Sequence, residues 1–376
     1  MITTVLVTLS LLSLALAMFA TYRVVRAAKN SRFIPARVRS IALEKVPSVS
    51  VCIPARNEDQ ALGRCLDAVI ASDYPKLEII VLDDDSVDNT SALARSYAHT
   101  GVRFIKGKDL PEGWIGRNYA YDNLREQASG RYIFFMSVDT HIGPESISQL
   151  VAYMMHKRVE MASVLPARLD GLRPGVLFAP LRYLQELVFS SKRSPATISS
   201  GWIVNRELLE NYFEGFDRFK DDILVERRIA EEFAQHDAYG FLINADQCDI
   251  SFEKHWSSQI ETSVRVYALT AASSVVRFTG SLLLALLASF PTLCILSACF
   301  MGFGPAFWVS LTTELAYMAM YVFYTSLVWS HGAWLAWLFW PFVILQETVL
   351  LVVAAAKRKR GTITWKGRPI FGRQAA

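Results

Sequence analysis

The uneven distribution of apolar residues constrains this chain more than any other feature of its sequence. Residues 2–20 form one uncharged apolar run, and three further apolar segments follow at 278–300, 305–329 and 333–355. They raise the hydrophobic share of the 376 residues to 52%, above the ~45–50% of ordinary soluble proteins. Because the stretch between these runs reads as a soluble sequence, we expect a soluble domain joined at both ends to membrane helices.

The first apolar run predicts a transmembrane anchor over residues 1–22. Its length is close to the roughly 20 residues that cross a bilayer as a helix. A cleaved signal peptide is the alternative, but such a peptide carries its positive charge before the apolar stretch. Here the basic residues follow it: Arg23, Arg26, Lys29, Arg32, Arg37 and Arg39. Because positive charge marks the cytoplasmic side, the domain that follows is predicted to be cytoplasmic.

The C-terminal region, residues 278–356, is predicted to form transmembrane helices, but the charges disagree with the number of segments. Three full crossings would place the tail 357–376 outside, whereas its run Lys357–Arg360 favours the cytoplasmic side. One segment is therefore re-entrant or interfacial, or the first bends at Pro291 into two short helices. Residues 251–277 are predicted to form an interfacial linker helix, and an ordinary surface helix is the alternative.

Between these regions, residues 46–250 are predicted to form one α/β domain. Short apolar runs at 50–55, 77–84 and 131–140 alternate with helical stretches, a pattern typical of a parallel sheet with helices on both faces. Ligands of such sheets bind beyond the carboxyl ends of the strands. The net charge is only +4, and no base-reading module or long basic arm is present, so we expect no nucleic-acid partner.

Carboxylates follow the predicted strands at the points where a ligand would bind. Asp83 and Asp84 close the second strand, Asp139 closes the third, and Asp221 and Asp222 come later in the domain. Transfer of a sugar from a nucleotide needs a group that binds the nucleoside, a ligand for a divalent cation at the diphosphate, and a general base for the acceptor hydroxyl. Three separated acidic positions can supply these three roles.

Five ordered motifs carry a resemblance to a known family: VSVCIPARNE, EIIVLDDDSVDNT, DLPEGWIGRNYA, MSVDT and DDILVERR. The chain resembles the inverting GT-A glycosyltransferases of the family 2 type. Within them it is most similar to the membrane-bound hopanoid-associated and carotenoid glycosyltransferases, and more distantly to ceramide glucosyltransferase. The resemblance implies a GT-A (Rossmann-like) mixed sheet with helices on both faces. It also implies a multi-pass protein of the cell membrane with a cytoplasmic catalytic domain.

The activity that the resemblance implies is transfer from a nucleotide-sugar donor, with a UDP-sugar favoured, to a hydroxyl of a membrane lipid or isoprenoid-type acceptor. The expected cofactor is a divalent metal, Mg²⁺ or Mn²⁺. The nucleotide-sugar site is expected to include residues after the first two strands: Pro54, Ala55, Glu58, Asp83 and Asp84.

The same resemblance assigns the remaining site residues. Arg117 follows the Gly-Trp-Ile-Gly loop and is expected to face the donor phosphates, where the family usually has Lys. Asp139 matches the metal-binding Asp of the DxD motif, and Ser137 stands where that motif usually begins with Asp. Asp222 matches the catalytic base, with Asp221 beside it in place of a Glu. Arg228 is a further candidate for a phosphate contact.

Two more departures from the family pattern add to that at Ser137, and alternatives stay open. Asp85 stands where the family often has Gly, and the Gln/Arg-x-x-Arg-Trp motif of processive synthases is absent. The acceptor could be a polyprenyl phosphate, which needs less base assistance. Because Ser137 replaces a carboxylate of the DxD motif, a second alternative is that the protein is a catalytically silent membrane partner with the same fold. Trp202 could line the acceptor cavity or pack in the core. Glu314 and Glu347 lie within apolar segments, where an ionisable residue is by default a candidate functional residue.

The identity of the sugar, the identity of the lipid and the oligomeric state are not fixed by these patterns.

Overall fold

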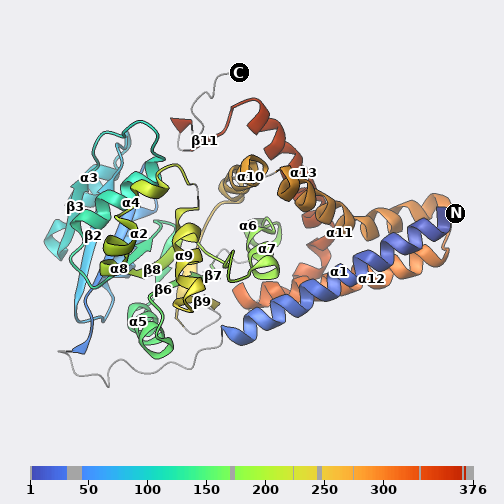
Figure 1. Cartoon of the computed structure of the whole chain (residues 1–376), viewed down its shortest axis with the longest axis horizontal. Coiled ribbons are helices and arrows are strands. Elements are labelled where there is room, and N and C mark those ends of the chain that lie inside the picture. Colours follow the sequence, from blue (N-terminus) through green and yellow to red (C-terminus); the bar gives the residue numbers. More distant parts are fainter. Residues whose placement is uncertain are drawn as a thin grey trace. The chain divides into compact units, whose positions relative to one another are not determined.

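The computed structural model describes residues 2–31, 45–169, 174–222, 224–243, 248–273, 275–329, 332–365 and 368–369 (Figure 1). The chain divides into two compact units. We call Ser31–Leu169 with Ser190–Glu253 the sheet unit, and Met1–Asn30 with Asp170–Phe189 and Lys254–Ala376 the helical unit. Residues 170–189, which the sequence places inside the domain 46–250, thus belong with the apolar helices.

The sheet unit is built on a seven-stranded sheet with the order β3-β2-β1-β4-β8-β6-β9. Its strands are β1 (Val49–Ala55), β2 (Leu77–Asp83), β3 (Val102–Lys106), β4 (Tyr132–Met136), β6 (Met161–Leu165), β8 (Gly201–Asn205) and β9 (Tyr239–Ile243). The strands β3, β2, β1 and β4 pair in parallel, whereas β8 runs antiparallel to both β4 and β6. The mixed sheet that the family resemblance implies is therefore confirmed. The strand pattern alone predicts a purely parallel sheet, and this is wrong at β8.

A second, three-stranded sheet has the order β5-β10-β7. Its strands are β5 (Thr140–Ile142), β7 (Ala167–Arg168) and β10 (Ile250–Phe252). The helices of the sheet unit are α2 (Leu62–Ile70), α3 (Thr90–Ser96), α4 (Gly116–Gln127), α5 (Ser146–Lys157), α8 (Arg206–Phe213) and α9 (Val225–Gln235), with short 3₁₀ turns at Tyr97–Thr100 and Asp217–Phe219.

Apolar side chains cover both faces of the large sheet. Along β1, Val51 and Ile53 belong to one core with residues of α2 and α5, and Cys52 belongs to another with residues of α4 and α9. Successive side chains of a strand point to opposite faces, so a strand buried on both faces must be apolar throughout. Trp202 is fully buried in the second core and stacks on Phe135 with ring centroids 4.4 Å apart. Its packing role is therefore the one that the structure supports.

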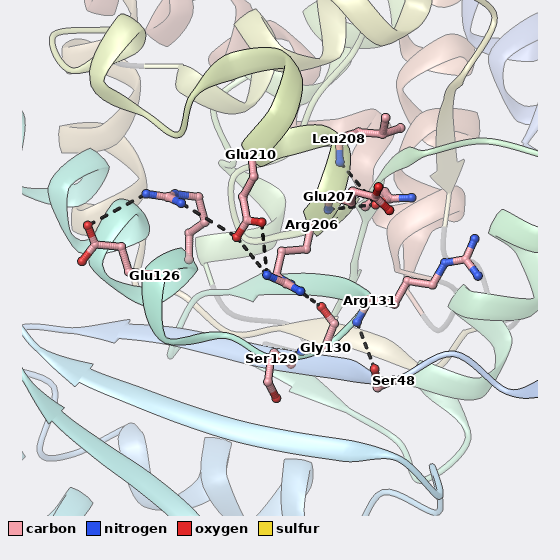
Figure 2. Close-up of polar contacts among 12 residues, drawn as sticks. Ser48, Glu126, Ser129, Gly130, Arg131, Arg206, Glu207, Leu208 and Glu210 are labelled. Carbon is pink, nitrogen blue, oxygen red and sulfur yellow. Dashed lines mark hydrogen bonds and ion pairs between the residues drawn. The ribbon is translucent and has the colours of Figure 1, made fainter. Parts of the chain in front are cut away.

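The amino end of β4 is tied to the start of α8 (Figure 2). The Arg206 guanidinium donates to the Gly130 carbonyl at 3.0 Å and to the Glu210 carboxylate at 3.0 Å. Gly130 cannot be replaced there, because a Cβ would lie 2.6 Å from the backbone nitrogen of Ser50. These contacts lie at the amino ends of β1 and β4, which leaves the carboxyl ends of these strands for a ligand.

The helical unit contains α1 (Ile2–Asn30), α6 (Pro174–Leu177), α7 (Arg182–Phe189), α10 (Trp256–Ser273), α11 (Val275–Met301), α12 (Pro305–Val328) and α13 (Ala336–Lys359). A 3₁₀ turn at Ala333–Leu335 precedes α13, and the short strands β11 (Thr364–Trp365) and β12 (Arg368–Pro369) follow it. Four helices of the described chain are long and apolar enough to cross a membrane: Ile2–Asn30, Val275–Ala298, Pro305–Val328 and Ala333–Lys359. The α11 helix continues through Pro291, so the two short helices considered for this segment do not form.

Candidate functional site

The carboxyl ends of β1 and β2 bring together four of the predicted nucleotide-binding residues. Ala55 pairs with Asp83 and Pro54 with Leu82, and the Asp84 amide donates to the Ala55 carbonyl at 2.8 Å. The Asp83 carboxylate accepts from the Ser91 hydroxyl and from the Ser86 amide, at 3.2 Å for the amide. Both aspartates are largely buried, so their orientation is fixed before any ligand binds.

The loop after β1 holds Glu58 beside this edge, since its amide donates to the Thr90 hydroxyl at 2.8 Å. Arg56, which the sequence motifs do not single out, donates to the Asp84 carbonyl and lies 3.8 Å from the Asp84 carboxylate. Asp85 has a φ of 57° in the left-handed region that favours Gly. An aspartate tolerates this conformation better than most residues, which explains how the turn forms without the family's Gly.

The segment after β4 carries Ser137 and Asp139. The register Cys52↔Phe135 places the end of β4 beside the end of β1, so Asp139 follows the same edge of the sheet as Asp83. The Ser137 amide donates to the Ser200 carbonyl at 3.0 Å, and the Ser137 hydroxyl lies 3.0 Å from that of Thr140. Ser137 thus takes part in fixing the turn that presents Asp139.

Asp139 is suited to bind a cation whose other ligands come from the substrate. No group of three or more His, Cys, Asp or Glu side chains that could hold a metal ion occurs in the part of the chain that the structure describes. Mg²⁺ is usually bound by one or two carboxylates together with substrate phosphates and water, not by a complete protein cage. A single carboxylate at a strand end therefore fits Mg²⁺ or Mn²⁺ bound jointly with a diphosphate.

Arg117 lies in the first turn of α4 and is anchored by an acidic residue from α9. Its guanidinium is 3.3 Å from the Glu226 carboxylate, and Glu226 is only 1% exposed. The guanidinium also lies over the Tyr121 ring, 5.7 Å from the centroid. Glu226 was not among the predicted site residues. It holds the charge of Arg117 at the start of the helix, close in sequence to the Gly-Trp-Ile-Gly loop.

The next residue of α4 positions the segment that carries Asp221 and Asp222. The fully buried Asn118 amide donates to the carbonyls of Phe219, Lys220 and Asp222, the first at 3.0 Å. The Ile115 amide adds a bond of 2.8 Å to the Lys220 carbonyl. These bonds join residues about a hundred positions apart in sequence, and no local pattern marked Asn118 for this role.

Asp221 is exposed, whereas Asp222 is half-buried. Burial raises the pKa of the Asp222 carboxyl above its ordinary value, the nearby positive charge of Arg228 opposes this rise in pKa, and the charge of Asp221 adds to it. The Arg228 guanidinium lies 3.3 Å from the Asp222 carboxylate and 3.0 Å from that of Glu231. Arg228, considered as a phosphate contact, therefore pairs with Asp222. A carboxylate with a raised pKa is better suited to accept a proton near neutral pH.

Comparison with known families matches residues 50–213 to "Glycosyl transferase family 2". Residues 50–213 are a glycosyl transferase family 2 domain. The match begins in β1 and ends in α8, so it includes the strand-end aspartates and Arg117. Among solved structures, a mannosyltransferase from Pyrobaculum calidifontis in complex with GDP-Man and Mn²⁺ is similar with a TM-score of 0.55 and 17% identity. The similarity covers 94% of this chain and 99% of that chain, and it shows a shared GT-A fold.

Two curated relatives align with part of this chain. An uncharacterized protein of Mycobacterium tuberculosis is 31% identical over 36% of this chain and 37% of its own length. A 4,4'-diaponeurosporenoate glycosyltransferase of Staphylococcus aureus is 30% identical over 32% of this chain and 32% of its own length. The chain thus spans about a third of the length of the curated relatives that it matches.

Proposed function

We propose that this protein is a metal-dependent inverting glycosyltransferase that moves a sugar from a nucleotide-sugar donor to a hydroxyl of a membrane lipid or isoprenoid-type acceptor. The observation that carries the proposal is the double role of the first turn of α4. Arg117 brings a positive charge to this turn, and Asn118 binds the backbone that carries Asp222. A group for the donor phosphates and a base for the acceptor are thereby held by adjacent residues.

In this mechanism the Asp222 carboxylate takes the proton of the acceptor hydroxyl. The acceptor oxygen forms a bond to the anomeric carbon while the bond from that carbon to the diphosphate oxygen breaks. The configuration inverts, so an α-linked donor gives a β-glycoside. A divalent cation bound at Asp139 would stabilise the negative charge of the departing nucleoside diphosphate. Asp83 and Asp84, with Pro54, Ala55 and Glu58, bind the nucleoside.

Two further observations support a lipid acceptor. The part of the chain that the structure describes has four helices long and apolar enough to cross a membrane. The Staphylococcus aureus relative is named for 4,4'-diaponeurosporenoate, an isoprenoid carboxylate, which supports the isoprenoid class of the acceptor and not its hydroxyl group. For the donor we favour a UDP-sugar. Because the similar mannosyltransferase structure contains GDP-Man, GDP-sugars should be tested beside UDP-sugars.

The proposal is tested with the full-length protein in nanodiscs, Mn²⁺ or Mg²⁺, a panel of UDP- and GDP-sugars, and extracted bacterial membrane lipids. We expect mass spectrometry to detect a lipid whose mass increases by one sugar, and NMR to show inversion at the anomeric carbon. Binding of a donor without transfer to any lipid would contradict the proposed activity. Absence of binding by every donor would favour a catalytically silent partner.

The contact between Asp222 and Arg228 predicts a specific pH dependence. Arg228 lowers the pKa of Asp222, so Arg228→Gln should raise that pKa. The deprotonated base is then lost at a higher pH, and the acidic limb of the kcat/KM profile should move to higher pH. Arg228→Lys, which keeps the charge, should leave the limb closer to the wild-type position. An unchanged limb in Arg228→Gln would contradict the assignment of Asp222 as the titrating base.

We further propose that α1, α11 and α12 cross the membrane and that α13 does not. The α1 and α12 helices run parallel, because the Ser10 and Ser310 hydroxyls lie 2.8 Å apart and those of Ser13 and Tyr317 lie 3.4 Å apart. The α11 helix runs antiparallel to α12, as Thr292 donates to Glu314 at 3.0 Å and the later Cys294 contacts the earlier Ala306 carbonyl at 3.8 Å. Such polar contacts between helices are common in membrane proteins.

Among the described residues, the polar and aromatic contacts of α13 with this three-helix bundle start at the middle of α11 and α12. Trp340 stacks on Tyr317 at 4.9 Å, just past the middle of α12, and Thr348 lies 3.1 Å from Ser289 at the middle of α11. Further along α13, Leu351 packs in a cluster with Tyr267 of α10. The half of the bundle on the side of these contacts is the one toward which the basic end of α1 points. Three crossings followed by an interfacial or re-entrant α13 would put the basic run after it in the cytoplasm, as the charge rule requires.

This topology predicts the side of the C-terminal tail. A cysteine introduced at Arg360 in a background free of native cysteines should react with an impermeant maleimide in inside-out vesicles and not in intact spheroplasts. A cysteine introduced at Met1 should show the opposite behaviour. Labelling of the Arg360 position from outside would mean that α13 crosses the membrane.

A further inference from the structure

Glu226 is a buried carboxylate that holds Arg117 and lies out of reach of a ligand. Its side chain is 1% exposed, whereas the side chain of Arg117, whose guanidinium is 3.3 Å from the Glu226 carboxylate, is 18% exposed. A ligand can therefore contact Arg117 and not Glu226. An effect of Glu226 on a ligand must come from its charge or from the position that it gives to the guanidinium.

The first turn of α4 combines two sources of positive potential. The start of a helix carries a partial positive charge and is a common binding position for phosphate groups. Arg117 adds a full charge there, and this turn contains no acidic residue of its own. The compensating negative charge comes from Glu226, in the first turn of α9, where an anion is favoured for the same reason.

The carboxylate of Glu226 reduces the positive potential that Arg117 presents to an anion. Salt screens a buried charge much less than an exposed one. At the effective dielectric constant near a protein surface, two unit charges interact about four times as strongly as in bulk water. Removing the charge of Glu226 should therefore strengthen the binding of an anion to Arg117, and the effect should grow with the charge of that anion.

The two nucleotides of the proposed reaction differ in charge at this position. In the donor both phosphates are diesters, and each carries a single negative charge. In the nucleoside diphosphate product the terminal phosphate is a monoester with a second ionisation at a pKa of about 6, so at neutral pH it carries most of a further negative charge. The charge of Glu226 therefore opposes binding of the product more than binding of the donor.

We propose that Glu226 is a positioning residue that holds Arg117 at the diphosphate and lowers the affinity for the nucleoside diphosphate product relative to the donor. The inference rests on the proposed function, because it takes Arg117 as the phosphate contact of that reaction. Glu226 thereby favours release of the product once the sugar has been transferred. Glu226→Gln isolates the charge, since Gln has the same length and keeps an oxygen that can accept from the Arg117 Nη2.

The test is calorimetric titration of the full-length protein in nanodiscs, with Mn²⁺ present, using UDP, the β-methyl ester of UDP, and uridine. The ester has the charge of a donor without its sugar, so the identity of the sugar does not affect the result. In Glu226→Gln we expect about tenfold tighter binding of UDP, about fivefold tighter binding of the ester and unchanged binding of uridine, since the Coulomb energy scales with the charge of the ligand. GDP, its β-methyl ester and guanosine form the parallel set.

Two further variants test the route through Arg117. Glu210→Gln is the matched control, because Glu210 pairs with Arg206 at 3.0 Å near the amino ends of the strands and should leave all affinities unchanged. Arg117→Gln should weaken binding of UDP and of the ester about tenfold, the usual effect of losing a hydrogen bond between charged groups, and should leave uridine binding unaffected.

Unchanged or weaker binding of UDP in Glu226→Gln, or equal tightening of UDP and its ester, would overturn the role of Glu226. Equal weakening of UDP, ester and uridine would show that Glu226 only supports the fold, and unaltered UDP binding in Arg117→Gln would remove the phosphate contact on which the inference depends. Normal sugar transfer with any of these results leaves the proposed function. The expected shifts in affinity without transfer to any lipid would keep the role of Glu226 and contradict the proposed function, and absence of UDP and GDP binding by the wild type would contradict both.

Discussion

Asp222→Asn should reduce the rate of sugar transfer by about 10²–10⁴-fold, the usual contribution of a general base. The amide has the size of the carboxylate but cannot accept the proton of the acceptor hydroxyl. The backbone bonds from Asn118 and Ile115 to this segment do not involve the side chain, so the fold of the segment should persist. Steady-state transfer and calorimetric titration with the donor are the two measurements, and donor affinity should stay within about twofold of wild type.

Asp217→Asn is a suitable control for the Asp222 variant. Its side chain is 75% exposed, five positions before Asp222, and the same isosteric change should leave the rate nearly unaffected. A fully active Asp222→Asn enzyme would remove Asp222 from the mechanism. A loss of only a few-fold would favour an acceptor that is already ionised, as a polyprenyl phosphate is, since such an acceptor needs little base assistance.

The strand-end residues of the site could be predicted because they depend on local sequence and on one rule of topology. Asp83 and Asp84 end an apolar strand, Asp139 follows another, and parallel neighbours place such ends at one edge. The orientation of β8 could not be predicted. Its five residues are buried on both faces, and a mostly apolar run carries no information about direction.

The sequence patterns also did not predict the residues that position the candidate site. Glu226 meets Arg117 from 109 positions away, and Asn118 binds carbonyl groups more than a hundred positions along the chain. Such contacts depend on how α4 and α9 pack on the sheet, and neither residue type is unusual in a helix. The charge pattern predicts that one C-terminal segment differs from the others, and this stays a prediction. The choice of α13 as that segment rests on its contacts in the structure, which the sequence does not give.

The second large effect is expected at Asp139. Asp139→Asn should weaken Mn²⁺-dependent binding of the donor at least about tenfold, because even the loss of a residue that only supports a metal ligand typically costs ~10–100-fold in metal affinity. The change is measured by calorimetric titration of the donor with Mn²⁺ and with EDTA, without any acceptor lipid. In EDTA, the variant and the wild type should bind the donor equally, since the nucleoside contacts that we propose for Asp83 and Asp84 are untouched.

Ser137 makes the Asp139 experiment more informative, because it stands where the family usually has a second carboxylate. Ser137→Asp adds that carboxylate in the same turn, next to the Thr140 hydroxyl that Ser137 now contacts at 3.0 Å. If Asp139 binds the metal, Ser137→Asp should strengthen the Mn²⁺-dependent part of donor binding, and combining it with Asp139→Asn should restore part of the loss. Equal Mn²⁺ dependence in wild type and Asp139→Asn would place the metal elsewhere, and the silent-partner alternative would then account better for Ser137.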